Sequence, residues 1–521
     1  MKRFLAASLF FLALVLAAGA HIGSPNVFFE GPAGGYSLYV VVRPPAALPG
    51  AADVSVQIRE GDVASVSLTS VQWQAGREGS PLPVFCERAA GGTNLWSGQV
   101  WFLRPGSYTL EVSLEGSQGR GQAIVPVNIL GLPGRQMGRP LQVALVIVGV
   151  ALLLGVVAIV RAISRDAMLP LGEKPLSAAS HWRVTVIAVI VLTAGVAAGA
   201  IRWREMDRVY RAQGIQKPEP VTATVLAEPE RLLLELQPVE QSLGSASWSQ
   251  LVPDHGKLMH LFLIREPVGD VFAHVHPLRQ DGQTFMLELP PLAAGDYQLY
   301  GELTFENGLN QTVISKVALP PPLGQGMLPP LASTNAAGEV ICGTTTLLTN
   351  EPGKIARDMD DSWHVEHVRV RSQKAPLKGP LFARLMGGYS LVFENAQGVE
   401  TGRDKELRFA AFAPDGREVG LQSYMGMPGH AVVRREDGSV FAHLHPSGSF
   451  SMASQRLFRE RLSGPESAAT QPNTNSPASN QVGFPYEFPA PGNYTLWIQV
   501  RIAGRVLTGV YDVKYSGGSV L

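Results

Sequence analysis

The pattern of apolar and polar positions divides the chain into short alternating runs and two long apolar segments. Alternating runs such as 36–43 and 54–59 are separated by proline and glycine, which is typical of half-buried β-strands joined by turns. Residues 141–160 and 184–201, in contrast, carry no charged side chain over twenty and eighteen positions, which is long enough to cross a bilayer. We therefore predict a mainly β protein with two transmembrane α-helices.

One short pattern occurs three times and indicates repeated modules. Each copy reads Pro or Ala, then Gly-x-Tyr-x-Leu, and the copies lie at 105–110, 294–299 and 491–496. A turn of this kind leading into a late strand suits immunoglobulin-like or cupredoxin-like β-sandwiches. We expect three sandwich modules that share one fold.

The N-terminus has the pattern of a secretory signal peptide, with Lys2 and Arg3 before an apolar run that ends in small residues. An uncleaved anchor is the alternative. Export of the first module followed by two crossings places both large soluble regions on the extracytoplasmic (periplasmic) side of a bacterial cell membrane. The loop between the apolar segments is rich in Lys and Arg, which favours a cytoplasmic loop.

These observations predict the following division of the chain: a signal peptide at 1–20, a β-sandwich at 21–135, a transmembrane helix at 141–163, a cytoplasmic loop at 164–183, a transmembrane helix at 184–202, a β-sandwich with a histidine triad at 219–320, a linker at 321–374, and a β-sandwich with a second triad at 375–516, which contains a disordered insertion at 463–482.

Composition narrows the classes of function. Lys and Arg total 43, as do Asp and Glu, so the chain carries no net charge that would indicate nucleic-acid binding. Two cysteines, Cys86 and Cys342, do not make a disulfide framework, and whether they pair is left open. We find no Gly-x-Ser-x-Gly, His-Glu-x-x-His or phosphate-loop motif, so the sequence does not predict an enzyme.

The strongest candidate chemistry lies in residues 430–446, HAVVRREDGSVFAHLHP. Two runs of strand-forming residues flank Asp437-Gly438, a preferred pair for a type I′ hairpin turn. That turn would place His430 opposite His445, and His443 would share their face because side chains alternate along a strand. Three imidazoles would then lie together at the open end of one hairpin.

A second copy occurs at 260–276, HLFLIREPVGDVFAHVH, and is one residue longer at the turn. A loop of Pro267-Val268-Gly269, with Gly269 in the left-handed conformation, restores the same pairing. His260 would then oppose His276, and His274 would share their face. Because two hairpins with turns of different length both bring three histidines together, we infer that the triad itself has a function.

Neutral imidazole is a common protein ligand for copper and zinc, so each triad is a candidate metal site. Met425 and Met427, with Met452 further on, could add a thioether beside the second triad and favour copper, particularly Cu(I). His255 takes the corresponding place beside the first triad, which would make that site harder and nearer to Cu(II) or Zn. His21, at the N-terminus after cleavage, could chelate copper through its amine and imidazole. The alternative is that the histidines only pack against one another.

Residues 259–299 and 429–496 share the pattern Met/Gly-His-x-x-x-x-Arg-Glu, Phe-Ala-His-x-His-Pro and Gly-x-Tyr. In this they resemble the YtkA-like and cupredoxin-like modules of bacterial envelope proteins, which are often found near copper-handling systems. An N-terminal His after a signal peptide also resembles periplasmic copper-resistance carriers. The resemblance implies copper sequestration or delivery. It does not extend to blue-copper electron carriers, because no cysteine lies near either triad.

Three hypotheses remain open from the sequence. The first is a membrane-anchored metal-binding protein for copper buffering, delivery or assembly, with zinc as the alternative ion. Its partners would be the membrane, metal ions and another envelope metalloprotein, without nucleic acid. The second is a structural scaffold of β-sandwiches without metal. The third is a copper- or zinc-dependent enzyme, for which no substrate-binding residue can be named.

Overall fold

The computed structural model describes most of the chain: residues 26–45, 48–89, 94–129, 139–166, 172, 178–214, 221–229, 231–239, 248–321, 358–365, 380–463 and 479–517. The predicted signal peptide, His21, Cys342 and most of the predicted insertion lie outside these residues. The chain divides into two units, one of residues Leu130–Gln216 and one of all the rest.

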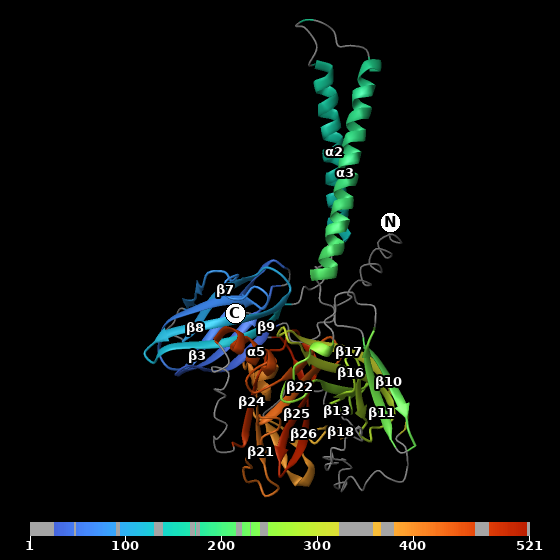
Figure 1. The fold of residues 1–521 in the computed structure, drawn as a ribbon. Coiled ribbons are helices and arrows are strands. Elements are labelled where there is room, and N and C mark those ends of the chain that lie inside the picture. The colour runs from blue at the N-terminus through green and yellow to red at the C-terminus, as the bar shows by residue number, and fades with distance from the viewer. Residues whose placement is uncertain are drawn as a thin grey trace, which may run out of the picture. The chain divides into compact units, whose positions relative to one another are not determined.

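The smaller unit consists of two helices, α2 (Arg139–Asp166) and α3 (Ala178–Gly214) (Figure 1). Within them, Pro140–Ile163 and Trp182–Arg208 are long and apolar enough to cross a membrane, with mean hydropathies of 3.2 and 2.5. The two predicted apolar helices are thus confirmed as helices of spanning length.

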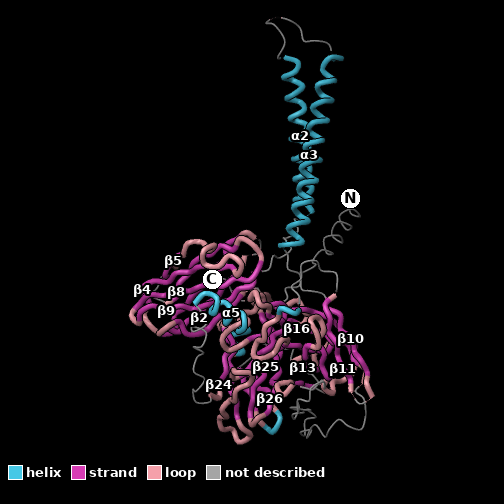
Figure 2. Tube along the Cα trace, viewed as in Figure 1, coloured by secondary structure: helices cyan, strands magenta, loops and turns pink. Residues whose placement is uncertain are grey.

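The larger unit is mainly β, as predicted (Figure 2), and its six sheets form three pairs along the chain. In the first module, the order β1-β2-β3-β7-β6 makes one sheet and β5-β4-β8-β9 the other. One apolar core lies between them. The strands are β1 (Val27–Ala33), β2 (Tyr36–Arg43), β3 (Gly50–Glu60), β4 (Val63–Gln72), β5 (Val84–Phe85), β6 (Glu87–Arg88), β7 (Leu95–Phe102), β8 (Gly106–Gly116) and β9 (Gly119–Ile129).

The second module pairs the sheet β10-β11-β15-β14 with the sheet β17-β16-β12-β13-β18 around its own core. Strand β18 comes from the segment expected to be a linker, so part of that segment joins this module. The elements are β10 (Val221–Ala227), β11 (Leu232–Pro238), η1 (Trp248–Gln250), β12 (His260–Arg265), β13 (Val271–Val275), β14 (Leu278–Arg279), β15 (Phe285–Glu288), β16 (Gly295–Thr304), β17 (Asn310–Leu319) and β18 (Ser362–Val365).

The third module pairs the sheet β19-β20-β21-β24 with the sheet β23-β22-β25-β26 around a third core. Its elements are β19 (Leu381–Arg384), η2 (Met386–Gly388), β20 (Ser390–Phe393), α4 (Ala396–Glu400), β21 (Glu406–Phe412), β22 (Gly429–Arg435), β23 (Phe441–Leu444), α5 (Met452–Ser463), β24 (Gln481–Pro485), β25 (Gly492–Ile502) and β26 (Arg505–Tyr515).

Both histidine hairpins have the predicted register. In β22 and β23 Ala431 pairs with Leu444, which puts His430 opposite His445 one step further out. In β12 and β13 Leu261 pairs with Val275, so His260 opposes His276 in the same way. The predicted left-handed Gly269 is also confirmed, with a φ of 70°.

The predicted type I′ turn at Asp437-Gly438 was wrong. That turn requires a positive φ at both residues, and of the two only Gly438, at 71°, has one. The Gly438 N–H instead donates to the Arg435 carbonyl at 2.9 Å, which closes the turn one residue earlier. The register survives because Arg435 still pairs across to Val440.

The histidine-bearing faces of the second and third modules pack against each other. Between them lies an apolar cluster that is separate from the three module cores and contains residues of both modules: Phe262, Ile264, Phe272, Tyr300, Val432, Phe441 and Trp497. The rings of Tyr300 and Phe441 stack with centroids 3.9 Å apart, and those of Phe272 and Trp497 with centroids 5.0 Å apart. At the turn end Arg434 pairs with Glu266 across this contact. We call this contact the module seam.

Phe441 is a test of the seam, because its ring is fully buried there. We expect Phe441→Ala to lower the free energy of unfolding by about 3–5 kcal/mol, the usual cost of emptying a buried aromatic site. Urea denaturation followed by circular dichroism measures this. Phe382→Ala is the matched control, since Phe382 is 68% exposed, and should change stability by less than about 0.5 kcal/mol. Equal effects from the two variants would contradict a packed seam.

The first module contacts the loop that follows the second hairpin. The Glu30 N–H donates to the Ser447 carbonyl at 2.8 Å, and the Ser449 N–H donates to the Phe28 carbonyl at 3.1 Å. Helix α5 packs on the same module, where the Gln455 side chain donates to the Ile124 carbonyl at 2.8 Å. The three modules are therefore joined by specific contacts within one unit.

Candidate metal centre

Seven of the eleven histidines of the chain meet at one end of the module seam. Their rings form an unbroken set of neighbours with centroid separations between 4.6 and 6.3 Å. All are buried or nearly so. They come from both modules: His255, His260, His274 and His276 from the second, and His430, His443 and His445 from the third. We call them the histidine cluster.

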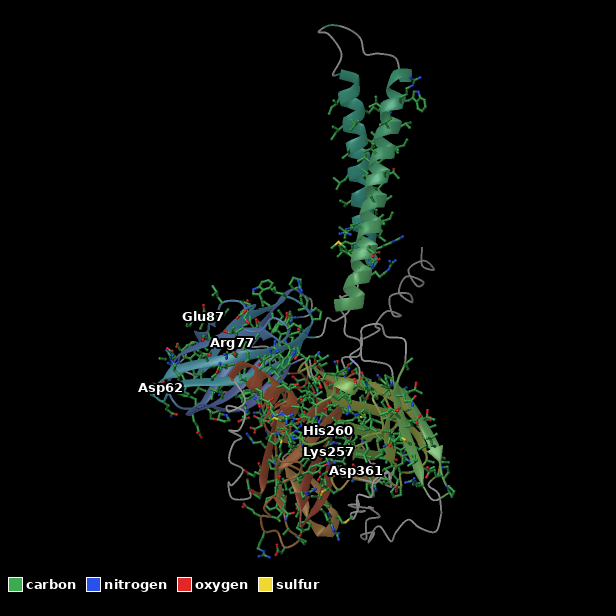
Figure 3. All side chains as sticks on the ribbon, viewed as in Figure 1. Asp62, Arg77, Glu87, Lys257, His260 and Asp361 are labelled. Atoms are coloured by element: carbon green, nitrogen blue, oxygen red, sulfur yellow. The ribbon has the colours of Figure 1, made fainter. Side chains whose placement is uncertain are left out.

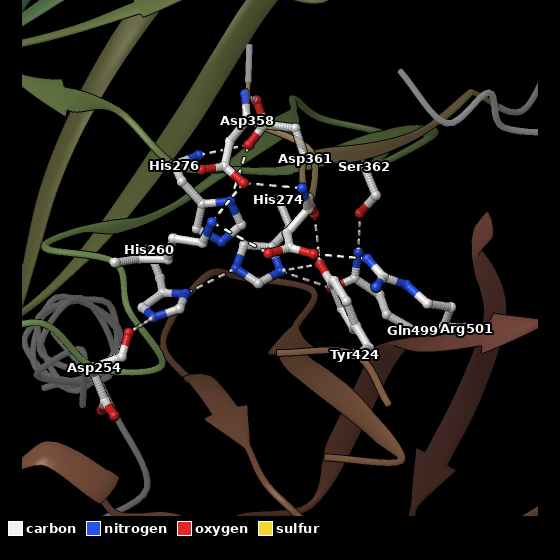
Figure 4. A network of polar contacts seen from close by, with 12 residues as sticks. Asp254, His260, His274, His276, Asp358, Asp361, Ser362, Tyr424, Gln499 and Arg501 are labelled. Carbon is white, nitrogen blue, oxygen red and sulfur yellow. Dashed lines mark hydrogen bonds and ion pairs between the residues drawn. The ribbon is translucent and has the colours of Figure 1, made fainter. Parts of the chain in front are cut away.

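The first triad, His260, His274 and His276, offers one ring nitrogen from each residue within 4.8 Å of the others. Hydrogen bonds fix which nitrogens carry the protons (Figure 4). His260 Nε2–H donates to the Asp254 carbonyl at 3.1 Å, and His274 Nδ1–H donates to Gln499 Oε1 at 2.8 Å. Since both acceptors are oxygens without protons, His260 Nδ1 and His274 Nε2 are left with lone pairs.

These two lone pairs face each other. His260 Nδ1 and His274 Nε2 lie 3.2 Å apart, and neither neutral ring has a proton to give to the other. Two nitrogens at about 2.05 Å from a tetrahedral ion would be separated by about 3.3 Å. The spacing therefore suits two ligands of one metal ion and is unfavourable for two bare imidazoles.

The third member, His276, is oriented by a carboxylate. Asp361 Oδ1 accepts from His276 Nδ1–H at 2.9 Å and from the His276 backbone N–H at 2.9 Å. A carboxylate on the outer nitrogen of a histidine is the usual support for a metal ligand, because it fixes the ring and raises the basicity of the inner nitrogen. Figure 3 shows Asp361 in the region of His260 and Lys257.

A third group that could hold a cation consists of His276, Asp358 and Asp361. Lys257 pairs with Asp358, and its Nζ also lies 3.2 Å from Asp360. Because this cation already neutralises the acidic turn, we interpret the turn as support for His276. Arg501, 2.6 Å from Asp360, adds a second positive charge.

The second triad differs from the predicted one. The nitrogens that lie within 4.8 Å of one another belong to His430, His445 and His255, and His255 comes from the other module. The prediction that His255 supplements the triad of its own module was therefore incomplete. His443 lies beside this group, with its ring 4.6 Å from that of His445 and 5.6 Å from that of His274.

His443 and His445, at the second triad, have supports of the same kind as those of the first triad. His443 Nδ1–H donates to Glu302 Oε2 at 2.9 Å, across the seam. His445 Nδ1–H donates to the Phe450 carbonyl at 3.2 Å. In each ring the remaining nitrogen, Nε2, is the one that faces away from these partners and stays unprotonated.

Six buried ring nitrogens of the cluster have no hydrogen-bond partner among the described residues: Nε2 of His255, His276, His443 and His445, and both nitrogens of His430. Each unsatisfied buried polar atom costs about 1–3 kcal/mol. Together they amount to a cost comparable with the whole stability of a typical domain, about 5–15 kcal/mol. A bound cation is the group that satisfies several lone pairs at once.

The electrostatics keep five of the rings neutral, as metal ligands must be. Burial, with the neighbouring histidines as a lesser cause, holds the pKa of His260, His274, His430 and His445 well below the usual value. Burial lowers the pKa of His443 to about 3. Burial, and then the nearby Asp254 carboxylate, raises the pKa of Glu302 to about 8.

The predicted methionines lie in different places. Met425 and Met427 belong to the turn that precedes β22 and are partly buried. Met452 Sδ accepts from the Ser447 hydroxyl at 3.3 Å, and its side chain packs against the core of the first module. Met452 therefore faces away from the cluster. His21 lies outside the described residues.

Sequence reasoning missed the polar groups that hold the histidines: the Asp254 carbonyl and the side chains of Glu302, Asp361 and Gln499. Two of them had a signal in the strand register, since Glu302 pairs with His260 and Gln499 with His430 on the neighbouring strand. Their true partners lie on the opposite module, which pairing within one sheet cannot reveal.

Comparison with known proteins gives one family match, to a "Domain of unknown function (DUF8832)", over residues 384–517. This region contains the second hairpin but covers about a quarter of the chain. No curated protein matches the chain by sequence.

Among solved structures, a tetra-tandem repeat of a large adhesion protein aligns over 90% of this chain and 96% of its own, with 11% identity and a TM-score of 0.15. An α2-macroglobulin of E. coli aligns over 94% and 23%, with 9% identity and a TM-score of 0.20. A putative membrane-anchored protein of Corynebacterium diphtheriae aligns over 94% and 95%, with 9% identity and a TM-score of 0.14. Scores this low carry no argument about fold or function.

Proposed function

We propose that this protein is a membrane-anchored, extracytoplasmic metal-binding protein that holds two metal ions, copper foremost, in the histidine cluster. Its role would be to buffer copper, to deliver it, or to supply it during assembly of another envelope metalloprotein. The observation that carries the proposal is the set of buried imidazole nitrogens that converge without a hydrogen-bond partner among the described residues.

The supporting side chains strengthen the proposal. Three rings of the cluster donate their outer N–H to a carboxyl or amide oxygen, namely those of His274, His276 and His443. Histidines that merely pack have no need for their inner nitrogens to be aimed at one another. Sites made only of imidazoles suit copper and zinc, and carboxylates are held back in supporting positions, which disfavours calcium and magnesium.

The fold and the location belong to the same proposal. We infer that each pair of sheets is an immunoglobulin-like or cupredoxin-like sandwich. The resemblance of residues 259–299 and 429–496 to envelope modules near copper-handling systems supports both this fold and this location. An N-terminal segment with the pattern of a secretory signal and two helices of spanning length support an anchor in a bacterial cell membrane, with both large soluble regions outside the cytoplasm.

Metal titration of the full chain in detergent tests the proposal. Cu(I), Cu(II) and Zn(II) are titrated in turn against competing chelators into the wild type and into His260→Ala/His445→Ala, which removes one ligand from each triad. We expect two tightly bound ions in the wild type and neither in the variant. His364→Ala is the control, because His364 is a buried histidine of β18 outside the three candidate groups.

Two results would contradict the proposal. One is a wild type that binds no ion more tightly than the variant. The other is equal loss of binding in His364→Ala, provided that circular dichroism shows all three proteins folded. In either case the scaffold hypothesis, in which the cluster only joins two modules, would take its place.

A further inference from the structure

The second and third modules meet through an approximate two-fold symmetry. His260 and His430 occupy the same place in their hairpins, and so do Glu302 and Gln499 beside them. The symmetry exchanges the supporting bonds: Gln499 of the third module accepts from His274 of the second, and Glu302 of the second accepts from His443 of the third. Each module therefore orients a histidine of the other.

The aromatic part of the seam follows the same symmetry. Phe272 and Phe441 hold the same position in their hairpins, and Tyr300 and Trp497 hold the same position on the neighbouring strands. Phe272 stacks on Trp497 with an interplanar angle of 11°, and Phe441 stacks on Tyr300 with an angle of 5°. Because the equivalent pairs both cross the seam, the symmetry holds from the aromatic stacks to the histidine cluster.

A matching pair of turns leads into the two hairpins. Asp254 and Lys257 exchange two backbone hydrogen bonds of 2.9 Å, and Tyr424 and Met427 exchange two of 2.7 and 3.1 Å. The second residue of each turn, His255 or Met425, has a φ of 49°, a left-handed value that non-glycine residues seldom adopt. The third residue of each turn is a glycine with a φ of 82° or 85°.

The first of these turns sends its second residue across the seam. His255 belongs to the second module, and its ring lies 4.8 Å from that of His445 and 5.5 Å from that of His430 in the third. The other turn also approaches the opposite triad, because the Tyr424 hydroxyl lies 3.4 Å from His274 Nδ1.

From this symmetry we infer that Met425 crosses the seam as His255 does and gives its thioether sulfur to the ion held by His260, His274 and His276. The inference rests on the proposed function and deepens it. One site would have three imidazoles and a thioether, whereas the other would have His255, His430 and His445 with His443 beside them. Sulfur prefers Cu(I), and an all-imidazole site suits Cu(II) or Zn(II) as well. The two sites would therefore differ in the ion they prefer.

This assignment is the reverse of the one that position along the chain would suggest, in which each turn residue serves the triad that follows it. Met425 precedes His430 by five residues, and His255 precedes His260 by five. Within each module the turn residue would serve its own triad, but the packed seam presents it to the other. The soft site therefore belongs to the second module and the harder one to the third.

The test uses the full-length protein loaded with Cu(I) and compares Met425→Leu with Met427→Leu. Met427 is the matched control because it is the other methionine of the same turn and, like Met425, is partly buried. X-ray absorption at the copper edge reports sulfur ligands directly. We expect one copper–sulfur distance in the wild type and in Met427→Leu, and none in Met425→Leu.

Affinity gives a second readout. In Met425→Leu, Cu(I) binding at one site should weaken by at least about tenfold, because loss of a direct ligand costs no less than loss of a group that supports a ligand. The other site should be unchanged, and His255→Ala should show the reverse. Two bound ions without any sulfur ligand, or a sulfur signal that persists in Met425→Leu, would overturn this inference alone. Absence of any bound ion would overturn it together with the proposed function.

Discussion

Replacing His430 by leucine should stabilise the metal-free protein and abolish the stabilisation that a metal ion gives through His255, His430 and His445. His430 is fully buried and both of its ring nitrogens lack a partner, so leucine removes two unsatisfied polar atoms while filling most of the volume. The expected gain is about 1–3 kcal/mol in the free energy of unfolding. In the wild type, an ion at about a thousand times its Kd adds about 4 kcal/mol per site, and the variant should lose that term at its second site.

Urea denaturation with a strong chelator, and again with Cu(I) or Zn(II), measures both effects. His274→Leu is the matched control with the opposite expected sign in the metal-free protein. It also removes a fully buried histidine, but it leaves Gln499 Oε1 without its donor. If His430→Leu destabilised the chelated protein as much as His274→Leu does, the ring would have a packing role and the metal hypothesis would lose its main support.

The second large effect is on pH dependence. Metal-free protein should lose stability steeply as the pH falls below about 6.5. Five buried histidines have a folded pKa held below the unfolded value by burial, namely His260, His274, His430, His443 and His445. Below pH 6.5 the unfolded chain binds protons at these rings and the folded chain does not. Stability is therefore fully present above that pH and is lost as the pH falls.

Glu302 acts in the opposite direction, because its folded pKa is raised to about 8. Between about pH 8 and 4.5 the folded state holds a proton there that the unfolded state has released, so this group favours folding as the pH falls. Five histidines against one carboxyl leave a net difference of about four protons. That corresponds to about 5 kcal/mol per pH unit, so about two units would remove the stability of a typical domain.

We therefore expect the chelated protein to unfold, or its seam to open, between about pH 6 and 4.5, with cooperative uptake of several protons. Circular dichroism and proton-uptake titration measure the midpoint and the slope. His430→Leu has one such group fewer, so its transition should lie at lower pH and be less steep. A chelated wild type that stays folded below pH 4, or a slope of one proton, would contradict this account.

The sequence by itself determined much of the local structure. Alternation of apolar and polar residues identified the hairpin strands and the faces of their side chains. Ala431, Val433 and Leu444 lie in the core as that alternation requires, while His430 and His443 lie on the other face. This follows because side chains alternate strictly along a strand, so register and face can be counted from residue order. The apolar helices followed from length and absence of charge.

Turn geometry was less well determined. Asp437-Gly438 suits a type I′ turn, but the chain closes the turn between Arg435 and Gly438. One contact within this turn and one outside it favour this: the Arg435 guanidinium donates to Asp437 and also to the Pro491 carbonyl. Such contacts override the local preference of the two residues for a type I′ turn.

Only the tertiary structure decided that the two triads form one cluster. A strand pattern shows that a face is covered, but it does not show which surface covers it. The cover of each histidine face is the other module, as His274 and Gln499, 225 residues apart along the chain, and His443 and Glu302, 141 residues apart, illustrate. Packing the aromatic faces together fixed that partner. It also carried His255 across to His430 and His445, a neighbourhood that no spacing within one module could have predicted.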